Sequence, residues 1–326
     1  MLRRVGFVVL TLGFFLVALA PMIRFYAAGR LVKAPLNEQT KTTYTARDAS
    51  YIDLASGSQV FGASLVQTLT VKGDVKAGDG KRAVWDSFSA LEDQGTGEAL
   101  QVIYWRMAFD RKNGQLTNCC RSAITNRLGT DTSTRQTGLG VMWPVGDVRH
   151  RTYQQFDPIT KHAWPAVYSG QEKVGGRTAD KFVQRISPTR VDSLPSAPLQ
   201  PLDGVTRYPA DVYYGAVVTT WVDPRTGMPI DQRRQITTTV GPNATNVMSA
   251  DLRLDDAGRK ALVELADNRA GHITEVRVTW PLIALVAGLA VLGIGTYLSL
   301  GTGTGAHSPA GRSKQQAEEQ QAESTT

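Results

Sequence analysis

Hydrophobic side chains are concentrated in two long runs, one near each end of the chain. The first run, Val5–Met22, contains no charged residue and follows Arg3 and Arg4. The second run, Trp280–Leu300, is also uncharged. A helix needs about 20 apolar residues to cross the hydrocarbon core of a bilayer. Because soluble helices rarely remain uncharged over such a length, both runs predict membrane-spanning helices, the second over residues 280–300.

The first run also fits a second interpretation, a cleaved secretory signal peptide. A basic start before an apolar stretch is typical of such peptides, and Ala18–Ala20 resembles a cleavage site. Pro21 would follow the cut, however, and the run is longer than the roughly 7–15 apolar residues usual in a signal peptide. We therefore prefer an uncleaved anchor over residues 1–26, with cleavage as the open alternative.

Two spans place both termini on one side of the membrane and residues 27–279 on the other. The basic residues that flank the two runs are nearly balanced, so their distribution does not set the orientation. An anchor with a basic start normally leaves its N-terminus in the cytoplasm. We predict a two-pass protein of the cytoplasmic (inner) membrane, with both termini cytoplasmic and the bulk of the chain extracytoplasmic.

Between the runs, the alternation of apolar and polar residues is typical of β-strands. Along Leu100–Phe109 one face carries Ile103, Trp105, Met107 and Phe109. The other strand candidates are Leu65–Lys72, Ala83–Leu91, Lys181–Ile186, Val212–Val222, Ile230–Val240 and Met248–Leu254. One short soluble helix is expected at about Asp256–Ala270. The predicted fold class is mainly β: an extracytoplasmic antiparallel sheet or sandwich flanked by N- and C-terminal transmembrane helices.

A turn signature, D-x-[KR]-[NT]-G, occurs twice, at Asp110–Gly114 and at Asp223–Gly227. Asp suits the first position of a turn and Gly a position with positive φ, so Asp110, Gly114, Asp223 and Gly227 are predicted structural turn residues. The repetition has two explanations. The chain contains a tandem pair of β units, roughly 45–150 and 151–255, or a common short signature recurs by chance.

The composition excludes some classes of protein but does not identify a chemical activity. The chain has 326 residues, 42% of them hydrophobic and 20% charged, which excludes a wholly disordered protein. The net charge of +7 lies partly around the first span, and there is neither a Lys/Arg stripe nor a nucleic-acid motif. We therefore expect no nucleic-acid partner. The low-complexity segment 301–326 predicts a disordered cytoplasmic tail.

The sequence contains no catalytic motif of the H-E-x-x-H, G-x-S-x-G or P-loop type. The four histidines are scattered and lack metal-ligand spacing. We assign no catalytic, metal or cofactor-binding residue, expect no cofactor, and predict a non-enzyme. An envelope hydrolase stays open as an alternative, because acidic pairs for acid–base chemistry meet in space rather than in sequence.

Cys119 and Cys120 are adjacent, which is the most unusual chemical feature of the chain. A disulfide between neighbours closes a strained ring that is easily reduced, so the two residues are a candidate redox pair. The alternative is two small side chains packed in or near a strand.

Several short motifs occur in order between the two spans. They are Tyr51–Leu54, Val71–Asp74, Ala83–Trp85, Phe109–Arg111, Thr152–Tyr153, Phe156–Asp157, Tyr168–Gly170, Val174–Gly176 and Val222–Gly227. With the basic start Arg3–Gly6 and the two spans, the chain resembles the actinobacterial porin A family, two-span cell-envelope proteins that carry a domain of unknown function. That family has a single cysteine-like position near Cys119, so the second cysteine is a departure.

The resemblance implies either a pore or a role in envelope growth and the handling of mycolate-type lipids. The strand candidates are interrupted by charge and suit water better than a lipid-facing barrel. Our leading hypothesis is therefore a non-enzymatic, membrane-anchored protein whose exported β domain binds envelope lipid, or a partner in lipid transport or envelope assembly. Its expected partners are the lipid bilayer, through two helices, and an envelope lipid or an inner-membrane transport protein. The alternative is a pore-forming oligomer, for which the spans offer only Thr11, Thr296 and Ser299 as polar groups.

Overall fold

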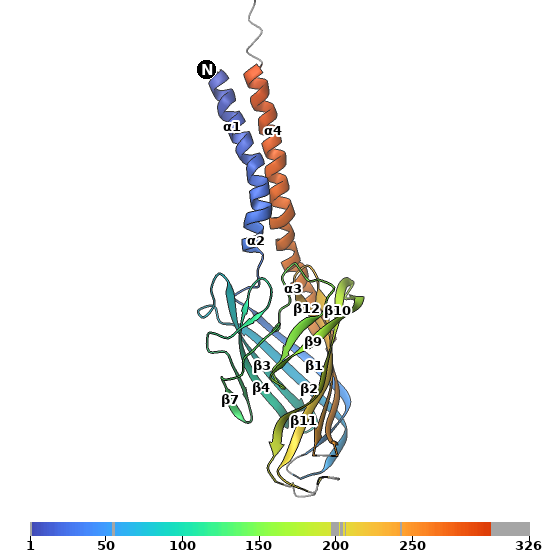
Figure 1. The fold of residues 1–326 in the computed structure, drawn as a ribbon. Helices are drawn as coiled ribbons and strands as arrows, with labels where there is room; N and C mark the ends of the chain where they lie inside the picture. The colour runs from blue at the N-terminus through green and yellow to red at the C-terminus, as the bar shows by residue number, and fades with distance from the viewer. Residues whose placement is uncertain are drawn as a thin grey trace, which may run out of the picture. The chain divides into compact units, whose positions relative to one another are not determined.

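The computed structural model of the chain describes residues 2–53, 56–196, 202, 205, 207–241 and 243–300. They form two units (Figure 1): a helical unit, which ends at Gly29 and resumes at Val276, and a β unit, Arg30–Glu275. The predicted disordered tail, 301–326, lies outside the described residues.

The helical unit consists of two helices that are long and apolar enough to cross a membrane, as predicted. The first helix, α1 (Leu2–Pro21), continues through a π-helical turn, η1 (Met22–Ala27), into α2 (Ala28–Leu31). The second helix, α4 (Trp280–Leu300), follows the π-helical turn η2 (Glu275–Thr279) and has the predicted bounds.

Glycines let α1 and α4 approach each other closely. A Cβ atom added to Gly13 would lie 2.8 Å from the backbone nitrogen of Leu292, and one added to Gly288 would lie 2.8 Å from that of Val17. Small residues at such contacts allow two transmembrane backbones to pack without intervening side chains. Gly293, by contrast, faces open space, with no atom within 4 Å of its would-be Cβ.

Within the described residues, the β unit is built on one sheet of 13 strands, in the order β7-β6-β4-β3-β2-β1-β13-β12-β11-β10-β9-β8, with β5 paired to β4. All pairings between these strands are antiparallel, so the predicted mainly β, antiparallel fold class is confirmed. The strands are β1 (Gln39–Ile52), β2 (Gln59–Gly73), β3 (Arg82–Asp93), β4 (Ala99–Asp110), β5 (Leu116–Thr117), β6 (Ala123–Asn126), β7 (Gly129–Asp131), β8 (Tyr153–Asp157), β9 (His162–Val174), β10 (Arg177–Leu194), β11 (Ala210–Asp223), β12 (Met228–Val240) and β13 (Thr245–Leu254). The first and last strands meet in the middle of the sheet, where Tyr44 lies opposite Leu254.

Each stretch predicted as a strand lies within a strand of the sheet. The predicted apolar face of β4 is buried: Ile103, Trp105, Met107 and Phe109 are all in the core. The predicted soluble helix is observed as α3 (Asp256–Thr274), where the Asp255 side chain caps the N-terminus by accepting a hydrogen bond from the Gly258 nitrogen at 2.7 Å.

The sheet is curled, and residues 138–145, which we call the bridging segment, connect β8, at one end of the sheet order, to β5, which pairs with β4 near the other end. Within it, the Leu139 nitrogen donates a hydrogen bond to the Gln154 oxygen of β8 at 2.7 Å. On the other side, the Leu116 nitrogen of β5 donates to the Gly138 oxygen at 2.8 Å. A single stretch of backbone thus connects strands from opposite ends of the sheet order.

The bridging segment is also fixed by its side chains. Leu139 and Trp143 are fully buried and pack with one residue from each of four strands, β8 to β11. These four residues are Tyr153, Ala166, Phe182 and Val222. The Trp143 ring lies 4.2 Å from that of Phe182, centroid to centroid.

The two halves of the sheet share a simple arrangement. Residues 45–150 contain most of the antiparallel meander β1–β4, and residues 151–255 contain the meander β8–β13. In each half, a signature turn follows the fourth strand, β4 or β11. The tandem repeat stays a prediction, which superposition of β1–β4 on β8–β11 would test.

Candidate functional site

A cavity of about 190 Å³ lies inside the curl of the sheet. Its wall includes side chains of β4 and of β8, which stand near opposite ends of the sheet order. Only a curled sheet can bring both to one cavity. The bridging segment and α3 complete the wall, with Met142 from the former and Leu262 from the latter. We call this cavity the cleft.

The strands present the cleft residues by simple alternation. On β3, Trp85, Ser87 and Ser89 are spaced by two and share the face that lines the cleft. On β1, Thr40 and Thr42 follow the same rule. In β1 and β3 the alternation therefore places hydroxyl groups, together with one tryptophan, at positions that would otherwise be core.

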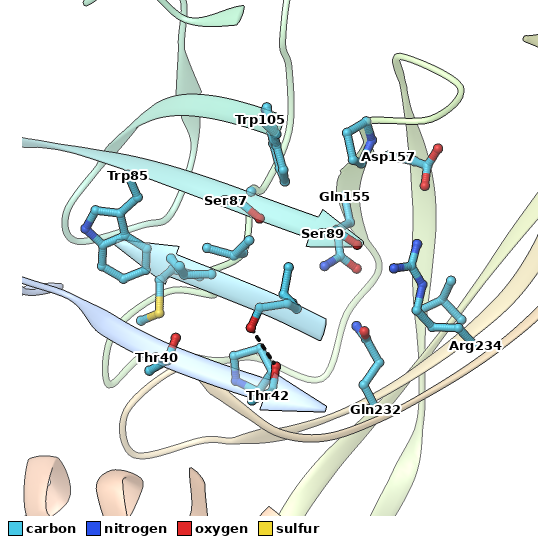
Figure 2. Close-up of a pocket in the computed structure, with 18 of the residues that line it drawn as sticks. Thr40, Thr42, Trp85, Ser87, Ser89, Trp105, Gln155, Asp157, Gln232 and Arg234 are labelled. Atoms are coloured by element: carbon cyan, nitrogen blue, oxygen red, sulfur yellow. Dashed lines mark hydrogen bonds between the residues drawn. The ribbon is translucent and has the colours of Figure 1, made fainter. Parts of the chain in front are cut away.

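The lining is amphipathic. Its apolar part includes Trp85, Ile103, Trp105, Met142 and Phe156, all buried. Its polar part consists mainly of hydroxyls and amides: Thr40, Thr42, Ser87, Ser89, Gln67, Gln101, Gln155, Gln184 and Gln232. Figure 2 shows Trp85 at one end of the cleft and Arg234, Gln232 and Asp157 at the other. An elongated molecule with one apolar and one polar end would match this arrangement.

Hydrogen bonds hold several lining side chains in place. The Trp105 indole nitrogen donates to the Gln136 Oε1 atom at 2.9 Å, and Gln67 Nε2 donates to Ser89 Oγ at 2.8 Å. The other amide atom, Gln67 Oε1, is buried and accepts no hydrogen bond. A buried acceptor without a donor favours a ligand that can supply one.

Among the described residues, two positively charged side chains line the cleft, and they differ in whether they form an ion pair. Arg269 of α3 is paired, since its Nη2 lies 2.7 Å from Glu38 Oε2. Arg234 of β12 has no carboxylate within ion-pair distance among the described residues, and its Nε is buried without a hydrogen-bond partner.

Asp157 is the acidic residue that attracts Arg234, but its carboxylate is already engaged. Asp157 Oδ1 accepts hydrogen bonds from the backbone nitrogens of Ile159 and Thr160, at 3.1 Å and 2.7 Å, and from the Thr160 hydroxyl at 3.0 Å. Burial raises the pKa of Asp157, although these hydrogen bonds and Arg234 act in the opposite direction.

The first predicted turn lies outside the cleft and supports the bridging segment. Asp110 Oδ1 accepts hydrogen bonds from the nitrogens of Lys112 and Asn113, at 2.8 Å and 3.0 Å. Gly114 has a φ of 72°, and a Cβ there would collide with the carbonyl oxygen of Met142. Only glycine fits this left-handed position against the bridging segment.

The second predicted turn contacts the same segment. Asp223 Oδ1 accepts from the Arg225 nitrogen at 2.8 Å, and Gly227 has a φ of 71°. The Trp143 nitrogen donates to the Gly227 oxygen at 3.0 Å, and a Cβ on this glycine would lie 2.6 Å from the Trp143 oxygen. The two turns, 113 positions apart by their numbering, therefore both support the bridging segment.

Cys119 and Cys120 form a disulfide between neighbours in the structure. They follow β5 and do not line the cleft. The Cys120 oxygen accepts a hydrogen bond from Arg106 Nε at 3.1 Å, and Arg106 also pairs with Asp74 and Asp86. A redox role for this pair stays a prediction.

The structure brings together one pair that sequence spacing did not suggest. His150 Nε2 lies 3.2 Å from Oδ1 of the buried Asp180, and the imidazole stacks on Tyr168. This pair does not line the cleft. Among the described residues, no three His, Cys, Asp or Glu side chains gather as metal ligands would.

The model of the family described as porin PorA matches residues 5–297, which include the entire β unit and most of α1 and α4. The chain belongs to the porin PorA family. The match confirms the resemblance carried by the ordered motifs. A search of curated proteins found no match.

The sequence pattern did not identify the residues that line the cleft, although one strand carried an indication of them. Ile230–Val240 was predicted as a strand, and Gln232 and Arg234 stand in phase with Ile230 and Ile236, which are buried. A glutamine and an arginine at inward positions of a predicted strand indicate a polar interior.

Proposed function

We propose that this porin PorA family member is a non-enzymatic, membrane-anchored cell-envelope protein with a porin-like role. In this proposal, which requires an oligomer, α1 and α4 of several copies enclose the path through the membrane, and solute passes along the cleft of the β unit in water. The observation that carries it is the bridge that Leu139 makes between Gln115, next to β5, and Gln155 of β8, beside an internal cavity of the curled sheet. Membership of a family described as porins supports it.

The surface of the strands restricts how such a role can work. The outward side chains of β1 include Lys41, Thr43, Thr45 and Arg47, and those of β12 include Arg233, Gln235 and Thr237. A barrel wall in contact with lipid needs an apolar outer band. We therefore infer that α1 and α4 anchor the chain in the cytoplasmic membrane and that the β unit lies in water, on the extracytoplasmic side.

Planar bilayer recordings with the full chain test the porin-like role. We expect conductance that falls when the cleft is blocked by Ser89→Trp, because Ser89 lines the cleft. The matched control is Phe88→Trp, since Phe88 is the next residue on the same strand and is 44% exposed. Equal conductance of both variants, or none from the wild-type chain, would contradict the proposal.

A second candidate function, binding of an envelope lipid, is favoured by the mixed lining of the cleft. Apolar side chains at one end and polar side chains at the other suit a lipid better than a simple ion. Native mass spectrometry of the full chain, extracted in mild detergent, would show a bound lipid that Ser89→Trp reduces and Phe88→Trp does not. A lipid-free chain without conductance would argue against both functions. A lipid-transport or envelope-assembly partner remains to be sought by co-purification.

A further inference from the structure

Among the described residues, Arg234 forms no ion pair, although Asp157 attracts it. Its guanidinium offers five N–H donors, and it lines the cleft. The Nε atom is buried and makes no hydrogen bond, and no described carboxylate lies within ion-pair distance. The Tyr214 hydroxyl is also buried; it is the neutral polar group that interacts with Arg234, although it makes no hydrogen bond of good geometry.

The next residue provides an internal comparison. Arg233 faces the opposite side of β12, and its Nε and Nη2 donate to the two carboxylate oxygens of Asp251 at 2.7 Å and 2.8 Å. The fold thus supplies a carboxylate in bidentate geometry to the outward arginine. It supplies none to the inward one, where removal from water makes an unpaired charge most costly.

The groups around Arg234 do not neutralise it. Burial raises the pKa of the Tyr44 and Tyr214 hydroxyls, so both stay uncharged. Burial also raises the pKa of Asp157, whose Oδ1 is occupied by the Thr160 backbone and side chain. Arg234 can therefore offer N–H donors to a ligand at the polar end of the cleft.

We propose that the cleft binds an amphiphile with an anionic headgroup, a carboxylate or a phosphate, which Arg234 holds while the hydrocarbon extends toward Trp85. The planar guanidinium matches both headgroups in bidentate geometry. The apolar end of the lining, with Trp85 and Met142, receives the hydrocarbon. This inference rests on the proposed function of the cleft as the site that solute or lipid enters, and it names the chemical class of that molecule.

The test uses the full chain in phosphatidylcholine nanodiscs and native mass spectrometry of complexes released from them. The probes are octyl phosphate, octyl glucoside and inorganic phosphate, which separate an anionic amphiphile from a neutral one and from the free anion. We expect octyl phosphate to bind about 10-fold or more tightly than either of the others, as charge-assisted hydrogen bonds allow.

The variants are Arg234→Gln, Arg234→Lys and the matched control Arg233→Gln, which removes the same charge from the other face of the strand. Arg234→Gln should weaken octyl phosphate binding by about 10- to 100-fold and leave octyl glucoside binding within about 2-fold. Arg234→Lys should retain only part of the affinity, because lysine keeps the positive charge but lacks the planar guanidinium that donates two parallel hydrogen bonds. Arg233→Gln should change neither. Far-ultraviolet circular dichroism verifies that each variant is folded.

Three results would overturn the inference. Unchanged octyl phosphate binding by Arg234→Gln would mean that the arginine serves only a solvated pair with Asp157. Equal losses for both amphiphiles would indicate a damaged lining. Binding of octyl glucoside alone would refute the anionic headgroup while the proposed function of the cleft survived. If no amphiphile binds, the lipid-binding function fails as well.

Discussion

The helical unit is stabilised internally by its smallest residues, whereas the β unit is stabilised internally by a large one. In the helical unit, α1 and α4 pack where side chains are absent, at glycines such as Gly13 and Gly288. In the β unit, the ends of the sheet are joined where a side chain is largest, at Trp143 of the bridging segment. Lipid offers no hydrophobic force between helices, so close backbone contact must supply the attraction. In water the hydrophobic effect drives burial of apolar surface, so large buried side chains stabilise the β unit.

This difference teaches that the same kind of substitution should have opposite effects in the two units. Removing volume should weaken the β unit, because a core cavity loses both transfer free energy and contacts. Adding volume should weaken the helical unit, because it separates two backbones. Variants that reverse these expectations would break the comparison.

The largest effect is expected from Trp143→Ala. The side chain is fully buried against Tyr153 and Phe182, so its loss should reduce the free energy of unfolding by about 3–5 kcal/mol. Urea unfolding of the full chain in detergent, followed by circular dichroism of the β signal, measures it. Phe61→Ala is the control, since Phe61 is 71% exposed and should contribute within about 0.5 kcal/mol.

The next effect is expected from Gly288→Leu. Its side chain would meet the Val17 backbone, so the α1–α4 contact should lose about 1–3 kcal/mol. Spin labels at Arg4→Cys and Leu300→Cys would report a wider distance between the helices by electron resonance. Gly293→Leu adds the same side chain where space is open and should leave the distance unchanged. If both variants widened the distance to a similar extent, loss of the glycine contact at Gly288 would not be the cause.

A smaller effect concerns Asp131, whose pKa is lowered by hydrogen bonds from Lys161, Thr134 and Ser133. A lowered folded-state pKa stabilises the fold above the unfolded value of about 3.9, and this stability is lost as the pH falls toward the folded-state pKa. Asp131→Asn should therefore cost about 1 kcal/mol at pH 7 and nothing at strongly acidic pH. Urea unfolding at several pH values would detect this, and a cost independent of pH would refute the electrostatic origin.

The smallest effect is expected at Asp157, where the sign is reversed. Burial raises its pKa, so ionisation opposes folding, and the fold loses stability as the pH rises from about 3.9 through the folded-state pKa. Asp157→Asn keeps the Oδ1 acceptor and removes the charge. It should be neutral or slightly stabilising at pH 7 and should lose that advantage below about pH 4. A clear loss of stability at pH 7 would show that the charge is needed beside Arg234.

Local pattern predicted most of the elements but not the cleft. The apolar runs gave both long helices, and period-two alternation gave the long strands around Trp105 and Leu252. The central strand β1 was not identified, because it has few large apolar residues, is interrupted by Lys41 and Arg47, and contains an irregularity near Asp48, which has a φ of 56°. Tertiary pairing with β2 and β13 overrides that weak local signal.

The sequence did not predict the cleft, for a different reason. Its lining comes from Glu38 through Arg269, with a few residues from each of several strands, and no local spacing indicates that they meet. Curling of the sheet brings them together, and curling depends on the contacts of the bridging segment. The turn residues, such as Gly227, could be read from the sequence because a turn is local. Their shared role in supporting the bridging segment could not.

Between the bridging segment and β8, the described backbone hydrogen bonds are those from Leu139 to Gln154 and from Phe156 to Leu139. Breaking them would enlarge the circumference of the curl while every pairing among the thirteen strands stayed intact. The bore of the cleft therefore depends on a few backbone contacts beside Leu139, whereas the buried Trp143 of the same segment stabilises the fold. Selection can change the size of molecule admitted by altering residues beside Leu139, provided that Trp143 is kept.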